Sequence, residues 1–165
     1  MRIPDPFTLI IFGGTGDLSH RKLFPALFKL YFQKRLATSF KIVGLGRRTY
    51  SDKVYREQIA ESLSEEKQSD LEREKLTSFL EHIHFQPLDV SKKSDFEALQ
   101  DRLHKFDKKI QKNILFYLAT APAFFAPVAR ELAALNLQNE VDGQQWRRII
   151  LEKPFGTDLE SAEVL

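Results

Sequence analysis

The sequence predicts an α/β fold in which a doubly wound, mostly parallel sheet carries helices on both faces. Five short apolar segments recur along the chain, and stretches with helical spacing separate them. Four of the segments are almost continuously apolar, which is typical of strands covered on both sides. The third is less apolar, because Pro87 limits it and histidines alternate along it. The expected strands are Phe7–Phe12, Phe40–Gly44, Ile83–Leu88, Asn113–Ala119 and Arg148–Glu152.

Apolar side chains spaced three or four residues apart predict the helices between these strands. The stripes are Leu23, Leu27, Leu30 and Tyr31; Leu63, Leu71, Leu76 and Leu80; Phe96, Leu99, Leu103 and Phe106; and Phe124, Val128, Leu132 and Leu135. Pro25 lies inside the first stripe, so we expect that helix to kink or to restart there. The charge-rich segment Glu61–Lys75 is expected to form a solvated helical face or a loose connection.

Length and composition exclude several classes of function. The chain has 165 residues, enough for one domain, and its 25 basic and 23 acidic residues leave a net charge of +2, too small an excess to predict a nucleic-acid partner. The absence of cysteine excludes disulfides, zinc–thiolate sites and thiol catalysis. The run at residues 7–12 is too short for a signal peptide or a membrane span, so we expect no membrane partner and a cytoplasmic location.

A glycine-rich turn follows the first expected strand directly. Its residues are Gly13, Gly14, Thr15, Gly16, Asp17 and Leu18. Glycine permits a tight turn and lets backbone N–H groups approach a pyrophosphate, and the next helix directs the positive end of its dipole at the phosphates. Asp17 is expected to face away from the ligand and to cap that helix. The turn predicts a Rossmann-like dinucleotide site, with a strand-to-helix turn that binds nothing as the alternative.

Two arginines, Arg47 and Arg48, follow the second expected strand. A fold that prefers NAD places an acidic residue here for the ribose 2′-hydroxyl, whereas arginine suits the 2′-phosphate of NADP. The nearest acid, Asp52, comes several residues later. The pair therefore favours NADP, with NAD still possible and two solvent-exposed arginines as the alternative.

Three further segments are expected at the same edge of the sheet, because the carboxyl ends of parallel strands share one edge. They are Asp89-Val90 after the third strand, Thr120-Ala121-Pro122 after the fourth, and Glu152-Lys153-Pro154-Phe155-Gly156 after the fifth. The first would flank the adenine, and the second would contact the cofactor ribose through its backbone. Lys153 could bind a substrate phosphate or orient a hydroxyl. Each segment is also compatible with an ordinary turn.

Other types of site find little support in the sequence. His82 and His84 share one face of a strand but have no further ligand set, so no metal site is expected. The Tyr-x-x-x-Lys pair of short-chain dehydrogenases is missing, and so is the G-x-S-x-G nucleophile turn.

Together these motifs resemble the N-terminal domain of glucose-6-phosphate dehydrogenases over essentially the whole chain. The segments that carry the resemblance are IFGGTGDLSHRKLFPALF at 11–28, IVGLGRR at 42–48, FYLATAPAFF at 116–125 and IILEKPFGTDLESA at 149–162. The Gly-Asp-Leu turn replaces the last glycine of the common G-x-G-x-x-G fingerprint. Its combination with Lys-Leu-Phe-Pro and a later Glu-Lys-Pro-Phe-Gly is highly specific.

The resemblance implies NADP in the glycine turn, with Arg47 on its 2′-phosphate and Arg48 at a less uniform position. Asp89 and Val90 match a cofactor-contacting pair. The resemblance places substrate contacts at Lys22, Lys153 and Pro154, where the lysines lie near the nicotinamide and the sugar phosphate and the proline matches a cis-proline. Ser19 and Gly46 stand where the family commonly has alanine.

The resemblance also implies a parent enzyme that oxidises D-glucose 6-phosphate to 6-phosphogluconolactone while reducing NADP, and that acts as a homo-oligomer. The family's Arg-Ile-Asp-His-Tyr-Leu-Gly-Lys segment and its catalytic histidine lie beyond the Glu-Lys-Pro motif, outside these residues. No histidine of the chain is placed to act as the base: His20, His82, His84 or His104. Residues 159–165 have the pattern of a helix that is cut short.

We therefore expect residues 1–165 to be a dinucleotide-binding fragment that lacks the C-terminal catalytic and dimerisation domain. Such a fragment would have no catalytic residue of its own, would be inactive, and could be monomeric. Two alternatives remain open. One is the cofactor domain of an inositol- or glucose–fructose-type oxidoreductase, and the other is a nucleotide-binding module without chemistry.

Overall fold

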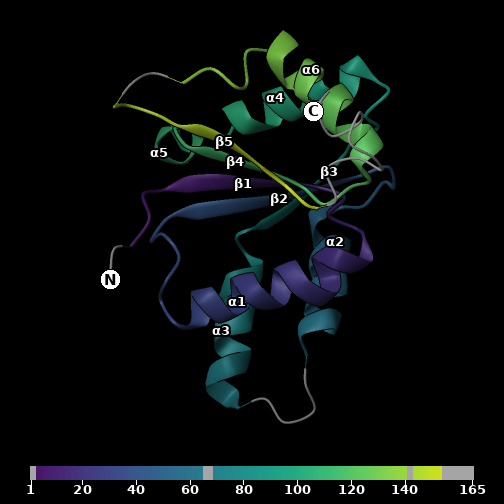
Figure 1. Ribbon diagram of the computed structural model, residues 1–165. Coiled ribbons are helices and arrows are strands. Elements are labelled where there is room, and N and C mark those ends of the chain that lie inside the picture. The colour runs from purple at the N-terminus through teal and green to yellow at the C-terminus, as the bar shows by residue number, and fades with distance from the viewer. Residues whose placement is uncertain (1–2, 65–68, 141–142, 154–165) are drawn as a thin grey trace.

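The computed structural model describes residues 3–64, 69–140 and 143–153, and its centre is a five-stranded, all-parallel sheet. The strand order is β3-β2-β1-β4-β5, with β1 in the middle (Figure 1). The strands are β1 (Phe7–Phe12), β2 (Phe40–Gly46), β3 (Ile83–Pro87), β4 (Ile114–Leu118) and β5 (Arg147–Leu151). This confirms the predicted doubly wound α/β class. β2 runs two residues further than predicted, because Gly46 still pairs with Pro87 of β3.

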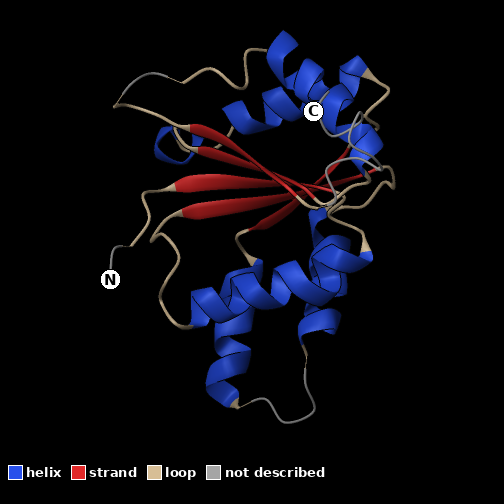
Figure 2. Ribbon diagram, in the orientation of Figure 1, coloured by secondary structure: helices blue, strands red, loops and turns tan. Residues whose placement is uncertain are grey.

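Helices cover both faces of the sheet and give three layers (Figure 2). The helices are α1 (Phe24–Phe32), α2 (Asp52–Leu63), α3 (Asp70–Leu80), α4 (Lys93–His104), α5 (Lys108–Gln111) and α6 (Phe125–Ala134). Figure 1 shows α1, α2 and α3 on one face of the sheet and α4 and α6 on the other.

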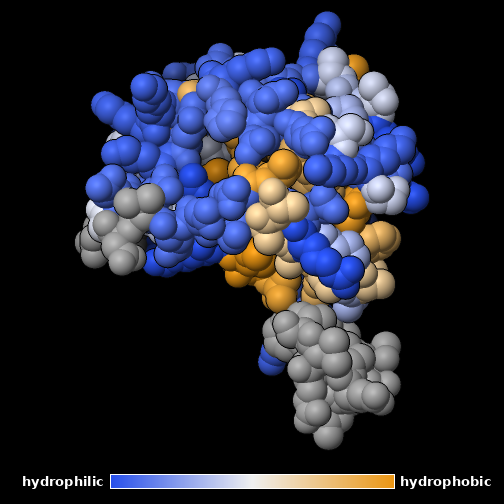
Figure 3. Space-filling view, turned by 90° about the horizontal axis from the view of Figure 1, so that it is seen from above, coloured by the Kyte–Doolittle hydropathy of each residue, from blue (hydrophilic) through white to orange (hydrophobic). Residues whose placement is uncertain are grey.

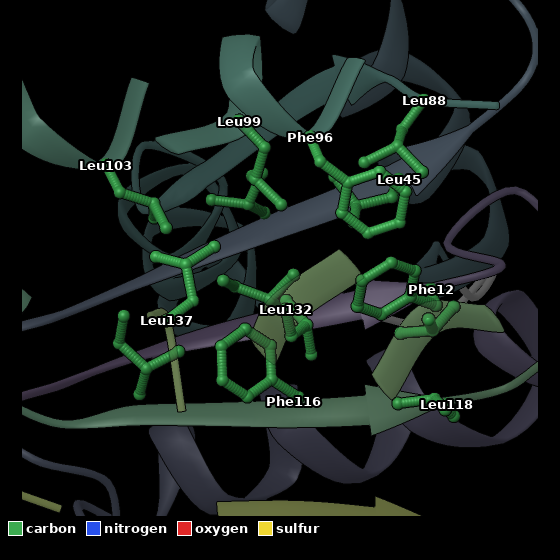
Figure 4. Close-up of a cluster of buried hydrophobic side chains, with 14 of the residues drawn as sticks. Phe12, Leu45, Leu88, Phe96, Leu99, Leu103, Phe116, Leu118, Leu132 and Leu137 are labelled. Carbon is green, nitrogen blue, oxygen red and sulfur yellow. The ribbon is translucent and has the colours of Figure 1, made fainter. Parts of the chain in front are cut away.

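Alternation along β1 divides the core into two clusters, since neighbouring strand residues point to opposite faces. Ile10 and Phe12 belong to the cluster under α4 and α6. In that cluster, drawn in Figure 4, the side chains of Phe96 and Leu132 pack toward the sheet. Leu9 and Ile11 belong to the cluster under α1, α2 and α3. Both faces of β1 are therefore buried, as its continuous apolar run predicted.

The interruption expected at Pro25 takes the form of a π-helical turn. Residues 17–32 are helical throughout, but Ser19–Leu23 form a π-turn and the regular α-helix begins at Phe24. The Phe24 N–H donates to the Ser19 carbonyl, five residues back. Proline has no N–H and its ring clashes with the preceding turn, so the wider turn just before Pro25 accommodates it.

The charge-rich segment 61–75 contains the end of α2 and the beginning of α3. Ser69 begins α3 with a capping box: its hydroxyl accepts the Glu72 N–H at 3.3 Å, and the Glu72 carboxylate accepts the Ser69 N–H at 2.8 Å. The described parts of this segment are therefore helical and mostly solvated, which agrees with the expectation of a solvated helical face.

The fifth strand departs from the expectation of burial on both faces. Ile149 and Ile150 are 44% and 40% exposed. In the described part of the chain β5 is an outer strand that pairs with β4, which leaves these two side chains open to solvent. Figure 3 views the face that carries α4 and α6, where a hydrophobic area interrupts a mostly hydrophilic surface. The helix expected over 159–165 lies outside the described residues.

Candidate functional site

The predicted cofactor segments meet at the carboxyl edge of the sheet. Each of them follows the end of a parallel strand, and parallel pairing brings these ends together. The order of the strands reverses between β1 and β4, and such a switch point forms the crevice where doubly wound sheets bind ligands. The glycine turn, which follows β1, lies at this point.

Gly13 has a conformation and surroundings that admit no side chain. Its φ is +82°, and a Cβ there would lie 2.6 Å from the Ala119 carbonyl oxygen at the end of β4. Its own carbonyl accepts the Gly16 N–H at 2.9 Å and the buried Ser19 hydroxyl at 2.9 Å. Gly13 therefore brings the turn against β4 and fixes where the following helix begins.

Gly14 is held against β2. Its N–H donates to the Leu45 carbonyl at 2.8 Å, and its carbonyl accepts the Tyr55 hydroxyl of α2 at 2.7 Å. A Cβ on Gly14 would lie 2.7 Å from the Gly44 Cα, so backbone meets backbone here. Tyr55 was not among the predicted residues. The glycine inside the apolar β2 segment was the available signal, because such a glycine marks a close approach.

The residues present fit a pyrophosphate. Among the described residues, the Thr15 N–H has no hydrogen-bond partner, and Thr120 Oγ1 at the end of β4 is buried without one. A Cβ on Gly16 would lie 3.1 Å from the Gly13 carbonyl oxygen, and one on Gly46 would lie 2.8 Å from Thr15 Oγ1. Free N–H groups in a glycine cradle at a helix N-terminus form the usual anion site of this fold.

Asp17 does not cap the helix, and that prediction is wrong. Residue 17 is already helical, and its carboxylate pairs at 3.7 Å with Arg21, one turn later. Both side chains are largely exposed, so this ion pair contributes little to stability. Leu18 is half-buried, and Lys22 is exposed on the π-turn.

Arg47 and Arg48 are both exposed directly after β2. Asp89, after β3, has its pKa lowered by hydrogen bonds from the Ser91 N–H and hydroxyl, and also by the positive charges of Lys92 and Arg47. The Arg47 charge therefore acts on Asp89 across the ends of β2 and β3. Arg48 instead donates to the Tyr50 hydroxyl at 2.9 Å.

The remaining predicted contacts lie on the same edge. Val90 is half-buried and packs on the α4/α6 cluster. Ala121 caps the short 3₁₀ turn that begins at Pro122. Glu152 accepts the Tyr117 hydroxyl, and burial together with that carboxylate raises the pKa of Tyr117 to about 12. Lys153 follows and is exposed, whereas Pro154 lies outside the described residues.

Asp52, the nearest acid after the arginines, is occupied by structural contacts that the sequence did not reveal. Its carboxylate accepts from Arg102 of α4 at 2.7 and 2.8 Å, from the Phe85 N–H at 2.8 Å and from His84 Nδ1 at 2.7 Å. Burial alone would raise the pKa of Asp52, but these hydrogen bonds and the Arg102 charge outweigh it and lower that pKa. Asp52 is therefore not available to a ribose.

His84 lies in a cluster whose burial disfavours its charged form. Its Nδ1 faces the Asp52 carboxylate and donates to it. Its Nε2 is buried and has no hydrogen-bond partner among the described residues, so a proton added at Nε2 would have no acceptor. Burial lowers the pKa of His84, and it also lowers those of His20 and His82. In the part of the chain that the structure describes, no group of three or more His, Cys, Asp or Glu side chains could hold a metal ion.

These histidines give a testable pH dependence. The unfolded chain takes up protons as the pH falls through about 6.5, whereas the native histidines remain neutral to lower pH, so the free energy of unfolding must fall over this range. Asp52 adds a second loss below about pH 3.8, where the unfolded carboxyl protonates first. Urea unfolding at pH 7.5, 6 and 5 measures the first loss, and unfolding at pH 4, 3 and 2 measures the second. A free energy that stays constant from pH 7.5 to 5 would contradict the burial of the histidines, and His84→Gln should reduce the loss.

The comparison with known proteins agrees with this geometry. A family model described as "Glucose-6-phosphate dehydrogenase, NAD binding domain" matches residues 10–165. The chain belongs to the glucose-6-phosphate dehydrogenase family. The match favours this family over the inositol- and glucose–fructose-type oxidoreductases and supports a nicotinamide dinucleotide as the cofactor.

Relatives within the glucose-6-phosphate dehydrogenase family are similar over nearly all of the chain. The glucose-6-phosphate 1-dehydrogenase of Aggregatibacter actinomycetemcomitans is 36% identical over 159 residues, which are 95% of this chain and 31% of the relative. A solved glucose-6-phosphate dehydrogenase in complex with its substrate glucose-6-phosphate is 31% identical, with a TM-score of 0.83, over 99% of this chain and 34% of that one.

A second solved structure, glucose-6-phosphate 1-dehydrogenase from Mycobacterium avium, is 25% identical with a TM-score of 0.80, over 98% of this chain and 32% of that one. The chain thus spans about a third of the length of these relatives. No described helix is long and apolar enough to cross a membrane.

Proposed function

We propose that this chain is the NADP-binding domain of an enzyme that oxidises D-glucose 6-phosphate to 6-phosphogluconolactone, the first step of the pentose phosphate pathway. The observation that carries the proposal is the glycine turn, which follows β1 at the point where the strand order reverses and lies on the same edge of the sheet as Arg47. The relatives of this domain are named glucose-6-phosphate 1-dehydrogenase. The remaining parts of the proposal are a cytoplasmic location, glucose 6-phosphate as the substrate, and a homo-oligomeric full-length enzyme.

NADP is proposed over NAD because two exposed arginines, and no free acid, directly follow β2. The pyrophosphate would lie on the turn from Gly13 to Leu18, and Arg47 would bind the 2′-phosphate. Asp52, the acid that could have bound a 2′-hydroxyl, is occupied by Arg102 and His84. One carboxylate oxygen of Asp89 accepts from Ser91, and Arg47 and Arg48 place two positive charges at the end of β2.

The catalytic half of the site is proposed to lie outside these residues. When bound, the nicotinamide supplies the acceptor for the hydride that leaves the sugar C1. The reaction also needs a base for the C1 hydroxyl proton. His20 packs against Phe24 and Tyr55, and His82 and His84 are half-buried in their own contacts. His104 is exposed at the end of α4, which precedes β4 and so lies at the opposite edge of the sheet. None of the four is therefore proposed as the base. Lys22 and Lys153 are exposed and could bind the sugar phosphate.

Binding and turnover should therefore separate in this chain. Calorimetric titration of the 165-residue chain with NADP should show weak to moderate binding at one site. The same chain, mixed with NADP and glucose 6-phosphate, should produce no NADPH. Production of NADPH would contradict the assignment of the base to residues beyond this chain, and an absence of NADP binding would contradict the proposed function itself.

A nucleotide-binding module without chemistry is the remaining alternative. It predicts the same binding by the isolated chain, but no dehydrogenase activity in the protein that contains it. Measuring glucose-6-phosphate oxidation by the gene product in which this domain occurs separates the two.

A further inference from the structure

The geometry points to Tyr55 as a positioning residue of the phosphate loop, which we propose sets the direction of the Thr15 N–H toward the cofactor. This inference rests on the proposed function, because it assigns a role within the same NADP site. Tyr55 lies on α2, 41 residues from Gly14 in the chain, and its side chain is fully buried. Figure 1 shows α2 at the end of the sheet where the loop lies.

The hydroxyl of Tyr55 can only act as a donor toward the loop. Burial raises the pKa of this phenol above its ordinary value, so the group keeps its proton. It donates that proton to the Gly14 carbonyl oxygen at 2.7 Å. The ring has little freedom, because it packs against the rings of Phe24 and Phe85. The distances from its centroid to theirs are 6.1 Å and 4.8 Å.

Two glycines, Gly14 and Gly44, leave room for the Tyr55 side chain beside the sheet. A Cβ on Gly44, in β2, would lie 2.0 Å from the Tyr55 hydroxyl oxygen and 2.5 Å from Cζ. A Cβ on Gly14 would lie 2.7 Å from the same oxygen. Both positions must therefore be glycine for the hydroxyl to reach the loop, which ties the sequence of β2 to the conformation of the turn.

A peptide bond is planar and trans, so its C=O and its N–H point in opposite directions. The C=O of Gly14 and the N–H of Thr15 belong to one such peptide. The bond from Tyr55 therefore aims the Thr15 N–H away from α2. Among the described residues nothing accepts this N–H, which leaves it as a donor for a ligand.

Without the hydroxyl, this peptide would have more than one accessible orientation. Glycine visits positive and negative φ with similar ease, and Gly13 and Gly14 precede the bond in question. The Gly14 N–H bond to Leu45 fixes the peptide before it, but not the peptide after it. A ligand that needs one orientation binds more weakly as fewer molecules adopt it, because its apparent Kd is the intrinsic Kd divided by the fraction of molecules in that orientation.

Tyr55→Phe tests the proposal, because it removes the hydroxyl and keeps the ring. We expect the Kd of NADP to rise about five- to tenfold, the effect of one hydrogen bond. Adenosine 2′-phosphate carries the 2′-phosphate but no pyrophosphate, so its Kd should change less than about twofold. The Thr15 amide resonance should shift in a ¹H–¹⁵N spectrum of the chain without ligand.

The matched control is Tyr31→Phe. Tyr31 is also packed among aromatic rings, Phe40 and Phe79, but it lies on α1 near the opposite end of β2. It should leave the Kd of NADP and the Thr15 resonance unchanged.

Several results would overturn the role of Tyr55. One is a Tyr55→Phe variant that binds NADP and adenosine 2′-phosphate more weakly by the same factor, and another is a Tyr31→Phe variant that has the same effects as Tyr55→Phe. The others are an unchanged NADP affinity in Tyr55→Phe and a Tyr55→Phe chain that does not fold. If wild-type protein does not bind NADP, the proposed function fails. The Thr15 resonance then still decides whether the hydroxyl holds this peptide, and an unshifted signal would overturn the proposal.

Discussion

Replacing Arg47 with alanine is expected to weaken NADP binding by about ten- to a hundredfold, while NAD binding changes little. A charge-assisted hydrogen bond contributes about 1.5–3 kcal/mol, and only NADP carries the 2′-phosphate that would receive it. Arg47 is exposed directly after β2, so the substitution leaves no buried group unpaired. Calorimetric titration of both cofactors against wild type and Arg47→Ala measures the effect.

Arg35→Ala is the control for this experiment. Arg35 is also exposed, but it precedes β2 and so lies at the opposite edge of the sheet. It should leave both affinities unchanged. Equal NADP affinities in wild type and Arg47→Ala would remove the 2′-phosphate assignment, and a similar loss in Arg35→Ala would point to general electrostatic attraction instead. Arg48→Ala should have a smaller effect than Arg47→Ala, because Arg48 is hydrogen-bonded to Tyr50.

The Gly44→Ala substitution should lower the free energy of unfolding by about 2–3 kcal/mol, because an overpacked core must move side chains or backbone. The new methyl group would lie 2.0 Å from the Tyr55 hydroxyl oxygen and 2.7 Å from Cε1, and that ring is fully buried. For a domain of this size, such a loss corresponds to roughly 4–12 °C in melting temperature. Urea unfolding gives the free energy directly.

A double-mutant cycle separates this clash from the loss of glycine as such. In a Tyr55→Leu background the shorter side chain no longer reaches over residue 44, so the same Gly44→Ala change should cost much less than in the wild type. Equal costs in the two backgrounds would show that the contact between Gly44 and Tyr55 is not the cause.

The layered fold was predictable because its strands are short apolar runs and its helices have apolar stripes. β1 is buried on both faces, as its six apolar or small residues indicate. The glycine turn was also predictable, since Gly13 needs a positive φ and a close approach that few other residues tolerate. β5 has the same apolar character, but burial depends on what packs against a strand, and its isoleucines are exposed in the described part of the chain.

The local role of Asp17 was mispredicted for a related reason. An Asp at the end of a turn is a common helix cap, but the helix here already includes residue 17, and Arg21 one turn later offers a charge at i+4. Whether an acid caps or pairs depends on where the first helical residue falls, and short sequence patterns give that position only to within a residue or two.

What the sequence alone determined is the α/β class, the position of the glycine turn, and the placement of Arg47 and Lys153 after their strands. These features depend on residues close together in the chain: apolar runs, a glycine cluster, and a charge at the end of a strand. The tertiary structure alone decided which distant groups meet. Tyr55 reaches the Gly14 carbonyl across 41 residues, and Asp52 meets Arg102 across 50, so that Asp52 is lost to the ribose. Such contacts depend on the strand order and on the packing of α2 and α4, and no spacing within a short segment records them.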